Sequence, residues 1–364
     1  MKVSEITSYL ESVAPLSLQE SYDNSGLQVG PFDLDVSGIL ISLDVTEEVI
    51  EDALKKECNM IVAHHPLIFE GLKRISGRNA SERVLMKAVK EDIAIYAGHT
   101  NFDSVYGGVS HYMADRLGLQ NTHILDPARD MLSKLVVFVP ADHAQRVREA
   151  MFSAGAGHIG EYDSCSFNTE GTGTFRGSDN SHPFVGEKGS LHHEPETRVE
   201  TILSSPVRKK VIEAMIKAHP YEEVAYDIYP LQNHYNRAGM GMIGALKERM
   251  NESQFMALVK DRFQATCLRH SRRLGKDIKK VAVCGGAGSF LLRKAIAAGA
   301  DAFISGDFKY HQFFDAEDRL VILDIGHYES EQFTQNLFYD LLTKKFPKFA
   351  VHLSDVNTNP IKYF

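Results

Sequence analysis

The chain has 364 residues, a hydrophobic fraction of 43%, a formal net charge of −8 and a sequence pI near 6.1. This length exceeds that of a usual single domain, so we expect two domains. The acidic balance argues against a general nucleic-acid binder. No apolar run approaches the roughly 20 residues that span a bilayer, and the polar residues among 1–15 argue against a signal peptide. The four cysteines form no C-x-x-C pair, which is typical of reduced thiols in a cytoplasmic protein.

The first third of the chain alternates apolar runs with helical patterns, as α/β proteins do. Thr46 is a candidate N-cap for the helix that follows the first core strand. The expected elements, in chain order, are a helix at 3–13, a turn-rich segment at 21–30, a strand at 38–44, a helix at 46–57, a strand at 59–63, a loop at 71–78, a helix at 81–90, a strand at 93–97 and a helix ending at 117.

Three apolar runs end in residue types that bind metals. The run 59–63 leads into His64 and His65, the run 93–97 into the segment 98–103, and the run 321–325 into the segment 326–331. Ligands collect beyond the carboxyl ends of the strands in open α/β sheets, so these segments are expected to share one rim. Two partly exposed loop histidines are the alternative interpretation of His64 and His65.

The last third repeats the plan of the first. A strand at 280–284 is followed by a turn at 285–288, a helix at 289–298 and a strand at 301–305 that leads into polar residues. The order predicts two related βαβ halves in one α/β core. The glycine-rich turn is either a phosphate cradle or a tight strand-to-helix turn; it lacks the G-x-G-x-x-G and G-K-[ST] patterns, which favours the turn.

The middle of the chain has a different pattern. The expected elements are a strand at 135–140, a helix at 141–154, hairpin strands within 161–176, a loop at 177–197, a strand at 198–203, a helix at 206–218 and a strand at 221–229. This βαβ-βαβ order predicts a ferredoxin-like α+β domain inserted into the core. The predicted boundaries are 1–126 and 234–364 for the core and 127–233 for the insert. The loop histidines, either metal ligands or solvated side chains, are His182, His192 and His193.

Four segments of the core resemble the Nif-three-like family, whose members are often labelled homologues of a type 2 GTP cyclohydrolase I. They are Tyr22-Asp23-Asn24-Ser25-Gly26-Leu27-Gln28-Val29-Gly30, Ala63-His64-His65-Pro66-Leu67, His99-Thr100-Asn101-Phe102-Asp103 and Gly326-His327-Tyr328-Glu329-Ser330-Glu331. The middle resembles the inserted domain of the longer bacterial members, which is similar to the PII and CutA fold. It does so most clearly at His219-Pro220-Tyr221-Glu222-Glu223-Val224-Ala225-Tyr226-Asp227.

The resemblance implies a di-metal site and a toroidal homohexamer with the inserted domains as trimeric caps, and it leaves the activity open. The metal ligands that it implies are His64, His65, Asp103, His327 and Glu331.

Imidazoles and carboxylates together suit Zn, Fe, Mn or similar divalent ions and not Ca. Five protein ligands are too many for one catalytic ion with open positions, and they suit two ions bridged by Asp103 or Glu331. Asp44, Asp307 and His311 follow equivalent strands. Each is a candidate general base or a support for a ligand, and each has a purely structural role as the alternative.

Two functional classes remain open from the sequence. One is a metal-dependent hydrolase of a nucleotide or another small polar substrate, in which water activated between two ions attacks carbon or phosphorus. Basic residues in the loop 71–78 would attract an anionic substrate there. The other class is a non-catalytic metal-binding or regulatory protein whose PII-like domain senses a ligand. The small apolar neighbours of Cys284 predict burial and a raised thiol pKa, which argues against a cysteine nucleophile.

Overall fold

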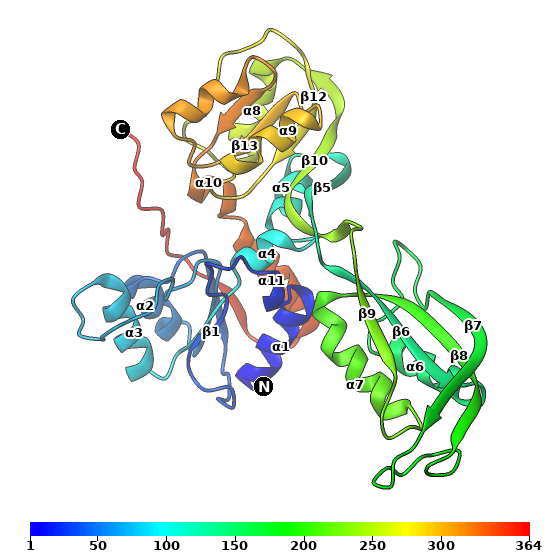
Figure 1. Ribbon diagram of the computed structural model, residues 1–364. Helices are drawn as coiled ribbons and strands as arrows, with labels where there is room; N and C mark the ends of the chain where they lie inside the picture. The colour runs from blue at the N-terminus through cyan, green and yellow to red at the C-terminus, as the bar shows by residue number, and fades with distance from the viewer. The chain divides into compact units, whose positions relative to one another are not determined.

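The computed structural model describes residues 1–364, and the contacts within it divide the chain into two compact units. The first unit combines Met1–Pro127 with Asn236–Phe364. The second unit is Ala128–Tyr235, so it interrupts the first unit in the sequence (Figure 1).

One sheet of the first unit is built from five strands: β1 (Gly26–Val29), β2 (Ile39–Ser42), β3 (Met60–Ala63), β4 (Ala94–Ala97) and β15 (Val351–Leu353). Their order is β1-β4-β3-β2-β15, with β2, β3, β4 and β15 parallel and β1 antiparallel to β4. β2, β3 and β4 are buried at every residue, because hydrophobic clusters cover both faces of this sheet.

Helices pack on each face of this first sheet. Apolar residues of α1 (Val3–Val13) and α11 (Thr334–Lys345) join one cluster, and those of α2 (Glu47–Lys55) and α3 (Ala80–Lys90) join the other. The Thr46 side chain accepts a hydrogen bond from Val49 N and caps α2, which confirms the predicted N-cap.

The other sheet of the first unit has six strands: β5 (Gln120–Ala128), β10 (Tyr235–Met250), β11 (Arg269–His270), β12 (Ile278–Val283), β13 (Ala302–Ser305) and β14 (Val321–Asp324). Their order is β11-β14-β13-β12-β10-β5, and β12, β13 and β14 are parallel. The strands β2, β3 and β4 of the first sheet thus correspond to the parallel strands β12, β13 and β14 of the second, as the repeated sequence pattern predicted.

Helices also pack on both faces of this second sheet. Apolar residues of α5 (Val109–Arg116) and α8 (Glu252–Phe263) pack on one face, and those of α9 (Leu292–Ala297) pack on the other. The remaining helical segments of the first unit are η1 (Leu16–Leu18), α4 (Thr100–Ser104), η4 (Ser289–Leu291), η5 (Tyr310–Ala316) and α10 (His327–Glu331).

The second unit has one antiparallel sheet of four strands: β6 (Leu132–Pro140), β7 (Ser166–Arg176), β8 (Leu191–Ser204) and β9 (Tyr226–Leu231). They lie in the order β7-β8-β6-β9. The helical segments are η2 (Ala141–His143), α6 (Ala144–Ser153), η3 (Ser205–Val207) and α7 (Arg208–Ala218). α6 and α7 lie side by side, and their apolar residues share one core with the inward residues of the sheet (Figure 1).

The sequence misplaced two boundaries in this unit. Residues 191–197 were expected in a loop, but they extend β8 because Leu191 pairs with Arg176 and Thr197 with Glu170. His192 and His193 therefore belong to a strand, not a loop. The last strand, β9, begins at Tyr226 and not at Tyr221, because the backbone bends at residues 220–223.

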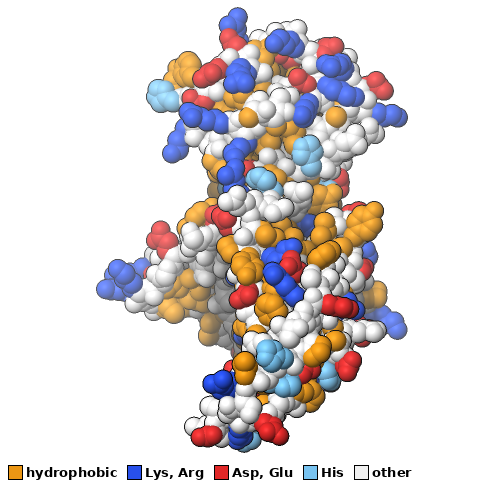
Figure 2. Space-filling model, turned by 45° about the vertical axis from the view of Figure 1, so that its right-hand side comes forward, with side chains coloured by type: hydrophobic (Ala, Val, Ile, Leu, Met, Phe, Trp, Pro, Cys, Tyr) orange, Lys and Arg blue, Asp and Glu red, His pale blue; other side chains and the backbone are white.

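None of the helices is long and apolar enough to cross a membrane. Basic and acidic side chains alternate over the face of the molecule in Figure 2, without a large area of one sign.

Candidate metal centre

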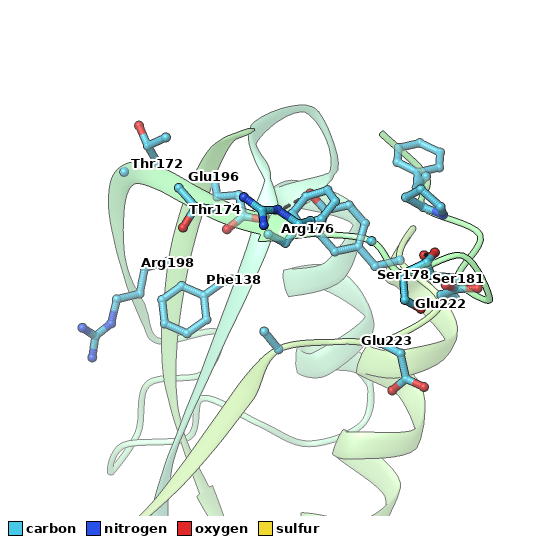
Figure 3. Close-up of a pocket in the computed structure, with 18 of the residues that line it drawn as sticks. Phe138, Thr172, Thr174, Arg176, Ser178, Ser181, Glu196, Arg198, Glu222 and Glu223 are labelled. Carbon is cyan, nitrogen blue, oxygen red and sulfur yellow. Dashed lines mark hydrogen bonds between the residues drawn. The ribbon is translucent and has the colours of Figure 1, made fainter. Parts of the chain in front are cut away.

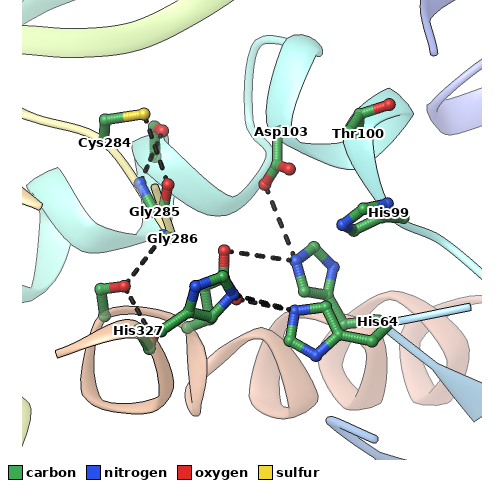
Figure 4. Close-up of polar contacts among 12 residues, drawn as sticks. His64, His99, Thr100, Asp103, Cys284, Gly285, Gly286 and His327 are labelled. Carbon is green, nitrogen blue, oxygen red and sulfur yellow. Dashed lines mark hydrogen bonds and ion pairs between the residues drawn. The ribbon is translucent and has the colours of Figure 1, made fainter. Parts of the chain in front are cut away.

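Strand ends of both sheets of the first unit supply a cluster of histidines and carboxylates (Figure 4). β3 ends directly before His64 and His65, and β4 ends shortly before His99. β14 leads through Gly326 into α10, which begins at His327 and ends at Glu331. Asp103 comes from α4, which follows β4, so the cluster lies at the carboxyl ends of parallel strands.

The nitrogen and oxygen atoms of these side chains form three overlapping groups. Within each group, the potential ligand atoms all lie within 4.8 Å of one another. The groups are His64 with His65 and His99, His65 with His327 and Glu331, and His64 with Asp103 and Glu331. The structure therefore brings together all five ligands that the family resemblance implied, and it adds His99.

Each imidazole is fixed through its Nδ1 atom. His64 Nδ1 lies 2.8 Å from the carbonyl oxygen of Gly98, which only accepts hydrogen bonds, so Nδ1 is the donor. Carboxylate oxygens lie 2.7 Å from Nδ1 of the other three histidines, in the pairs Asp44 with His65, Asp23 with His99, and Asp307 with His327. A neutral imidazole that donates from Nδ1 presents the Nε2 lone pair to the cluster, which is the arrangement of metal-binding histidines.

Two atoms of the cluster are suited to bind a metal ion, because no hydrogen-bond partner in the protein satisfies them. His64 Nε2 and Asp103 Oδ1 are buried, and neither has a hydrogen-bond partner. These atoms are 3.8 Å apart, and His64 is completely buried. Leaving a buried polar group unpaired costs about 1–3 kcal/mol. A bound cation would satisfy both atoms at once, so the residues present are suited to hold one.

Glu331 belongs to two of the three groups. Its Oε2 atom lies 3.0 Å from His65 Nε2 and 3.0 Å from His327 Nε2, whereas its Oε1 atom lies 3.7 Å from His64 Nε2. Its two oxygens thus face different sets of ligands. The sequence allowed either Asp103 or Glu331 to bridge two ions. The geometry favours Glu331, because its two oxygens face different histidines.

The charges of the cluster shift several pKa values. Burial alone would lower the pKa of His65, but its hydrogen bonds to Asp44 and Glu331 outweigh burial and raise the pKa to about 10. In the same way, Glu331 and Asp307 raise the pKa of His327 to about 9 against the effect of burial. Burial and the negative charge of Glu331 raise the pKa of Asp103 to about 7. Without a cation, the cluster therefore retains protons that a bound metal ion would displace.

A glycine turn packs directly against Glu331. Gly286 has a φ of +58°, and a Cβ atom on it would lie 2.3 Å from Glu331 Oε1. Its amide donates to the Ser330 hydroxyl, and its carbonyl accepts from Gly306 N. The turn 285–288 is therefore needed for a close approach to the carboxylate.

The three candidate general bases lie in different places. Asp44 and Asp307 hold His65 and His327 through Nδ1, and Thr358 in turn donates to Asp44. His311 is exposed in η5, where its ring packs against Tyr310 and Phe314, and the structure does not bring it into the cluster.

His99 is the residue of the cluster that the sequence reasoning left out of its ligand set. His99 lies in the segment that resembles the family, four residues before Asp103. Its orientation toward the cluster depends on Asp23, which is distant in the sequence. Asp23 also accepts from Thr100 N, the Thr100 hydroxyl and the Ser25 hydroxyl, so the turn-rich segment 21–30 serves to hold this carboxylate. Burial would raise the pKa of Asp23, but these hydrogen bonds lower it well below the ordinary value.

Two further expectations concern the surroundings of the cluster. Cys284 is buried, and burial raises the pKa of its thiol, as its small apolar neighbours predicted. The basic side chains of the loop 71–78, Lys73, Arg74 and Arg78, are exposed to solvent.

The fold and the cluster together define a mixed α/β protein with histidine and carboxylate groups able to bind metal ions. The model of the Duf34/NIF3 (NGG1p interacting factor 3) family matches residues 1–360, and the chain belongs to this family.

Relatives and solved structures agree with this assignment. A curated relative from Bacillus subtilis (strain 168), named GTP cyclohydrolase 1 type 2 homolog, is 40% identical over 99% of this chain and 98% of its own. A relative of the same name from Halalkalibacterium halodurans is 42% identical over 97% of this chain and 96% of its own. The crystal structure of a Bacillus cereus protein related to NIF3 matches with a TM-score of 0.86 and 42% identity, over 100% of this chain and 99% of that one.

Proposed function

We propose that the chain is a metal-dependent hydrolase that holds two divalent ions and acts on a nucleotide or another small polar substrate. The observation that carries the proposal is the pair of buried, unpaired atoms, His64 Nε2 and Asp103 Oδ1, beside a carboxylate that faces two sets of ligands. The relatives named GTP cyclohydrolase 1 type 2 homolog make nucleotides a natural first substrate class to test.

The residues that would hold the ions are His64, His65, His99, Asp103, His327 and Glu331. Divalent ions of the Zn, Fe or Mn type, when bound, supply Lewis acidity that polarises a carbonyl or phosphoryl group and lowers the pKa of water. The protein's own contribution is orientation. Asp44, Asp23 and Asp307 hold three imidazoles by Nδ1, so that each Nε2 lone pair faces inward.

The test combines metal analysis with a substrate screen. Protein purified without chelator should contain two divalent ions per chain, and the double variant His65→Ala with Glu331→Ala should lose them. A panel of nucleotides and phosphoesters that includes GTP should reveal a substrate whose turnover ends with chelator and in Asp103→Ala. Glu91→Ala, at an exposed carboxylate after α3, is the control and should keep full activity.

The outcomes separate the two functional classes. Full metal content without turnover of any member of the panel would favour a non-catalytic metal-binding or regulatory protein. Turnover that persists in chelator, with the metal content confirmed near zero, would make any bound metal structural and refute the hydrolase.

We also infer that residues 128–235 form an inserted ferredoxin-like unit of the PII and CutA type. The element order β6-α6-β7-β8-α7-β9 and the antiparallel sheet order β7-β8-β6-β9 support this inference. In this interpretation the insert supplies none of the metal ligands, all of which lie in the first unit.

We further propose that the chain assembles as a homohexamer. Exposed aromatic side chains support contacts between copies: Phe290, Tyr310 and Phe314 are each more than 60% exposed, and the rings of Tyr310 and Phe314 are in contact. Sedimentation velocity should give the mass of six chains. A monomer at micromolar concentration would contradict this proposal.

A further inference from the structure

The second unit contains a cavity of about 750 Å³ (Figure 3). Its walls are the hairpin of β7 and β8, the connection between these strands, and the turn before β9. Pockets for small molecules usually measure about 300–1,000 Å³, so this cavity can enclose a small organic ligand.

The connection that forms one wall is held in place. The backbone amide of His182 donates to Glu222 Oε1 over 2.7 Å, which ties the connection to the turn before β9. Gly189 N donates to the carbonyl of Gly177 over 2.8 Å and closes the base of the connection. These two hydrogen bonds therefore fix the position of the wall that the connection forms.

Aromatic rings line much of the cavity. Phe175 and Phe184 both pack against Tyr221, with ring centroids 6.0 Å and 6.3 Å from that of Tyr221. Phe138 contributes a further ring from β6. The faces of aromatic rings attract cations as well as apolar groups.

The charged groups of the cavity favour a cation. Four carboxylates lie in its lining, against two guanidinium groups, and one of these, Arg198, is already paired with Glu200 at 2.9 Å. Glu196 has no basic partner in the structure; its Oε1 atom accepts the Tyr221 hydroxyl over 3.1 Å. A Cβ atom on residue 173 would lie 2.0 Å from Glu196 Oε2, so Gly173 makes room for this carboxylate.

We propose that this cavity binds a small organic cation with an aromatic or other apolar body. The Glu196 carboxylate receives the ammonium or amidinium group, and the rings of Tyr221, Phe175 and Phe184 receive the body. The site is built entirely from residues of the second unit, so it does not depend on the metal centre or on the proposed hydrolase activity.

The test uses the full-length protein and three probes that share a phenyl ring and a four-carbon chain and differ in the terminal group, which is cationic, neutral or anionic: phenylbutylamine, phenylbutanol and phenylbutyrate. Saturation-transfer NMR and calorimetry should show binding in the order amine, alcohol, carboxylate. Glu196→Gln keeps an acceptor for the Tyr221 hydroxyl. This substitution should lower the affinity for the amine by about tenfold, as expected for an ion pair worth about 1.4 kcal/mol. The affinity for the alcohol should stay unchanged.

Glu213→Gln is the matched control, because Glu213 is an exposed carboxylate of α7 outside the cavity. It should leave the affinity for all three probes unchanged. Phe184→Ala should lower the affinity for the amine and for the alcohol to the same extent, because it removes part of the apolar wall. Thermal unfolding of each variant checks that it folds.

Three results would overturn the proposal. The first is that phenylbutyrate binds as tightly as phenylbutylamine. The second is that Glu196→Gln binds the amine with unchanged affinity. The third is the absence of binding by any probe. A changed sedimentation coefficient of Phe184→Ala is then the informative result. That result would assign this surface to contacts between copies of the chain.

Discussion

Replacing Gly286 by alanine tests whether the glycine turn is required by the metal centre. The new Cβ atom would lie 2.3 Å from Glu331 Oε1, and real Cβ atoms do not approach other atoms closer than 3.0 Å. The Glu331 carboxylate must therefore move by about 0.7 Å, the difference between these two distances. Metal–ligand distances tolerate about 0.2 Å. We expect metal affinity to fall by about 10- to 100-fold, the usual loss when the support of a ligand is removed.

Gly299→Ala is the matched control for this experiment. Gly299 also has a positive φ, +72°, but a Cβ atom there would meet no atom within 4 Å. Both variants lose about 1–2 kcal/mol to the left-handed backbone conformation, so the comparison isolates the contact with Glu331. Competition with a metal chelator measures affinity, and urea unfolding measures stability. Equal metal affinity in the two variants would refute the argument that Gly286 makes room for a ligand.

Three further predictions concern other parts of the chain. Asp44→Ala should lower metal affinity by about 10- to 100-fold in chelator competition, because His65 loses its acceptor, and Asp44→Asn should lose less; unchanged affinity in Asp44→Ala would contradict this. The buried carboxylate of Glu252 accepts the amides of Leu274 and Gly275, which lower its pKa against the effect of burial. Glu252→Gln should therefore cost about 1.5–3 kcal/mol in urea unfolding at pH 7. The difference in unfolding free energy between wild type and Glu252→Gln should become smaller as the pH falls below about 4.3, the ordinary pKa of the carboxyl in the unfolded chain. A difference that stays constant with pH would show that the lowered pKa of Glu252 does not contribute to stability. Replacing residues 128–232 by a short Gly/Ser bridge should leave a folded protein that binds metal, and loss of metal would show that the insert is integral to the centre.

The parallel strands could be predicted because their signals are local. β2, β3 and β4 are short apolar runs, and each is buried at every position. The start of α2 could be predicted from Thr46, because an N-cap side chain binds a backbone amide only three residues further along the chain. The same locality made the pair His327 and Glu331 predictable, since both lie on α10, one helical turn apart.

The missed features depend on partners distant in the sequence. His99 faces the cluster because Asp23 holds its other nitrogen, and no local pattern at His99 reports this contact. The added length of β8, residues 191–197, likewise depends on the partner strand, because a segment with two histidines, two glutamates and a proline forms a strand only when β7 pairs with it. His311 follows β13 as Asp44 follows β2, yet η5 directs it to solvent.

The metal centre needs both sheets of the first unit. His64 and His65 come from the end of β3, whereas His327 and Glu331 come from the end of β14, so neither half holds the complete set. Within the second sheet, the turns after β12 and β13 approach α10 closely, and a side chain on the glycine of either turn would meet this helix. Gly286 lies against Glu331, and a Cβ atom on Gly306 would lie 2.8 Å from the amide nitrogen of His327. A cation shared through Glu331 would bind the folded arrangement of both halves and not the unfolded chain. Its binding free energy would therefore add directly to the stability of the core, by about 2.7 kcal/mol at a free metal concentration one hundred times Kd.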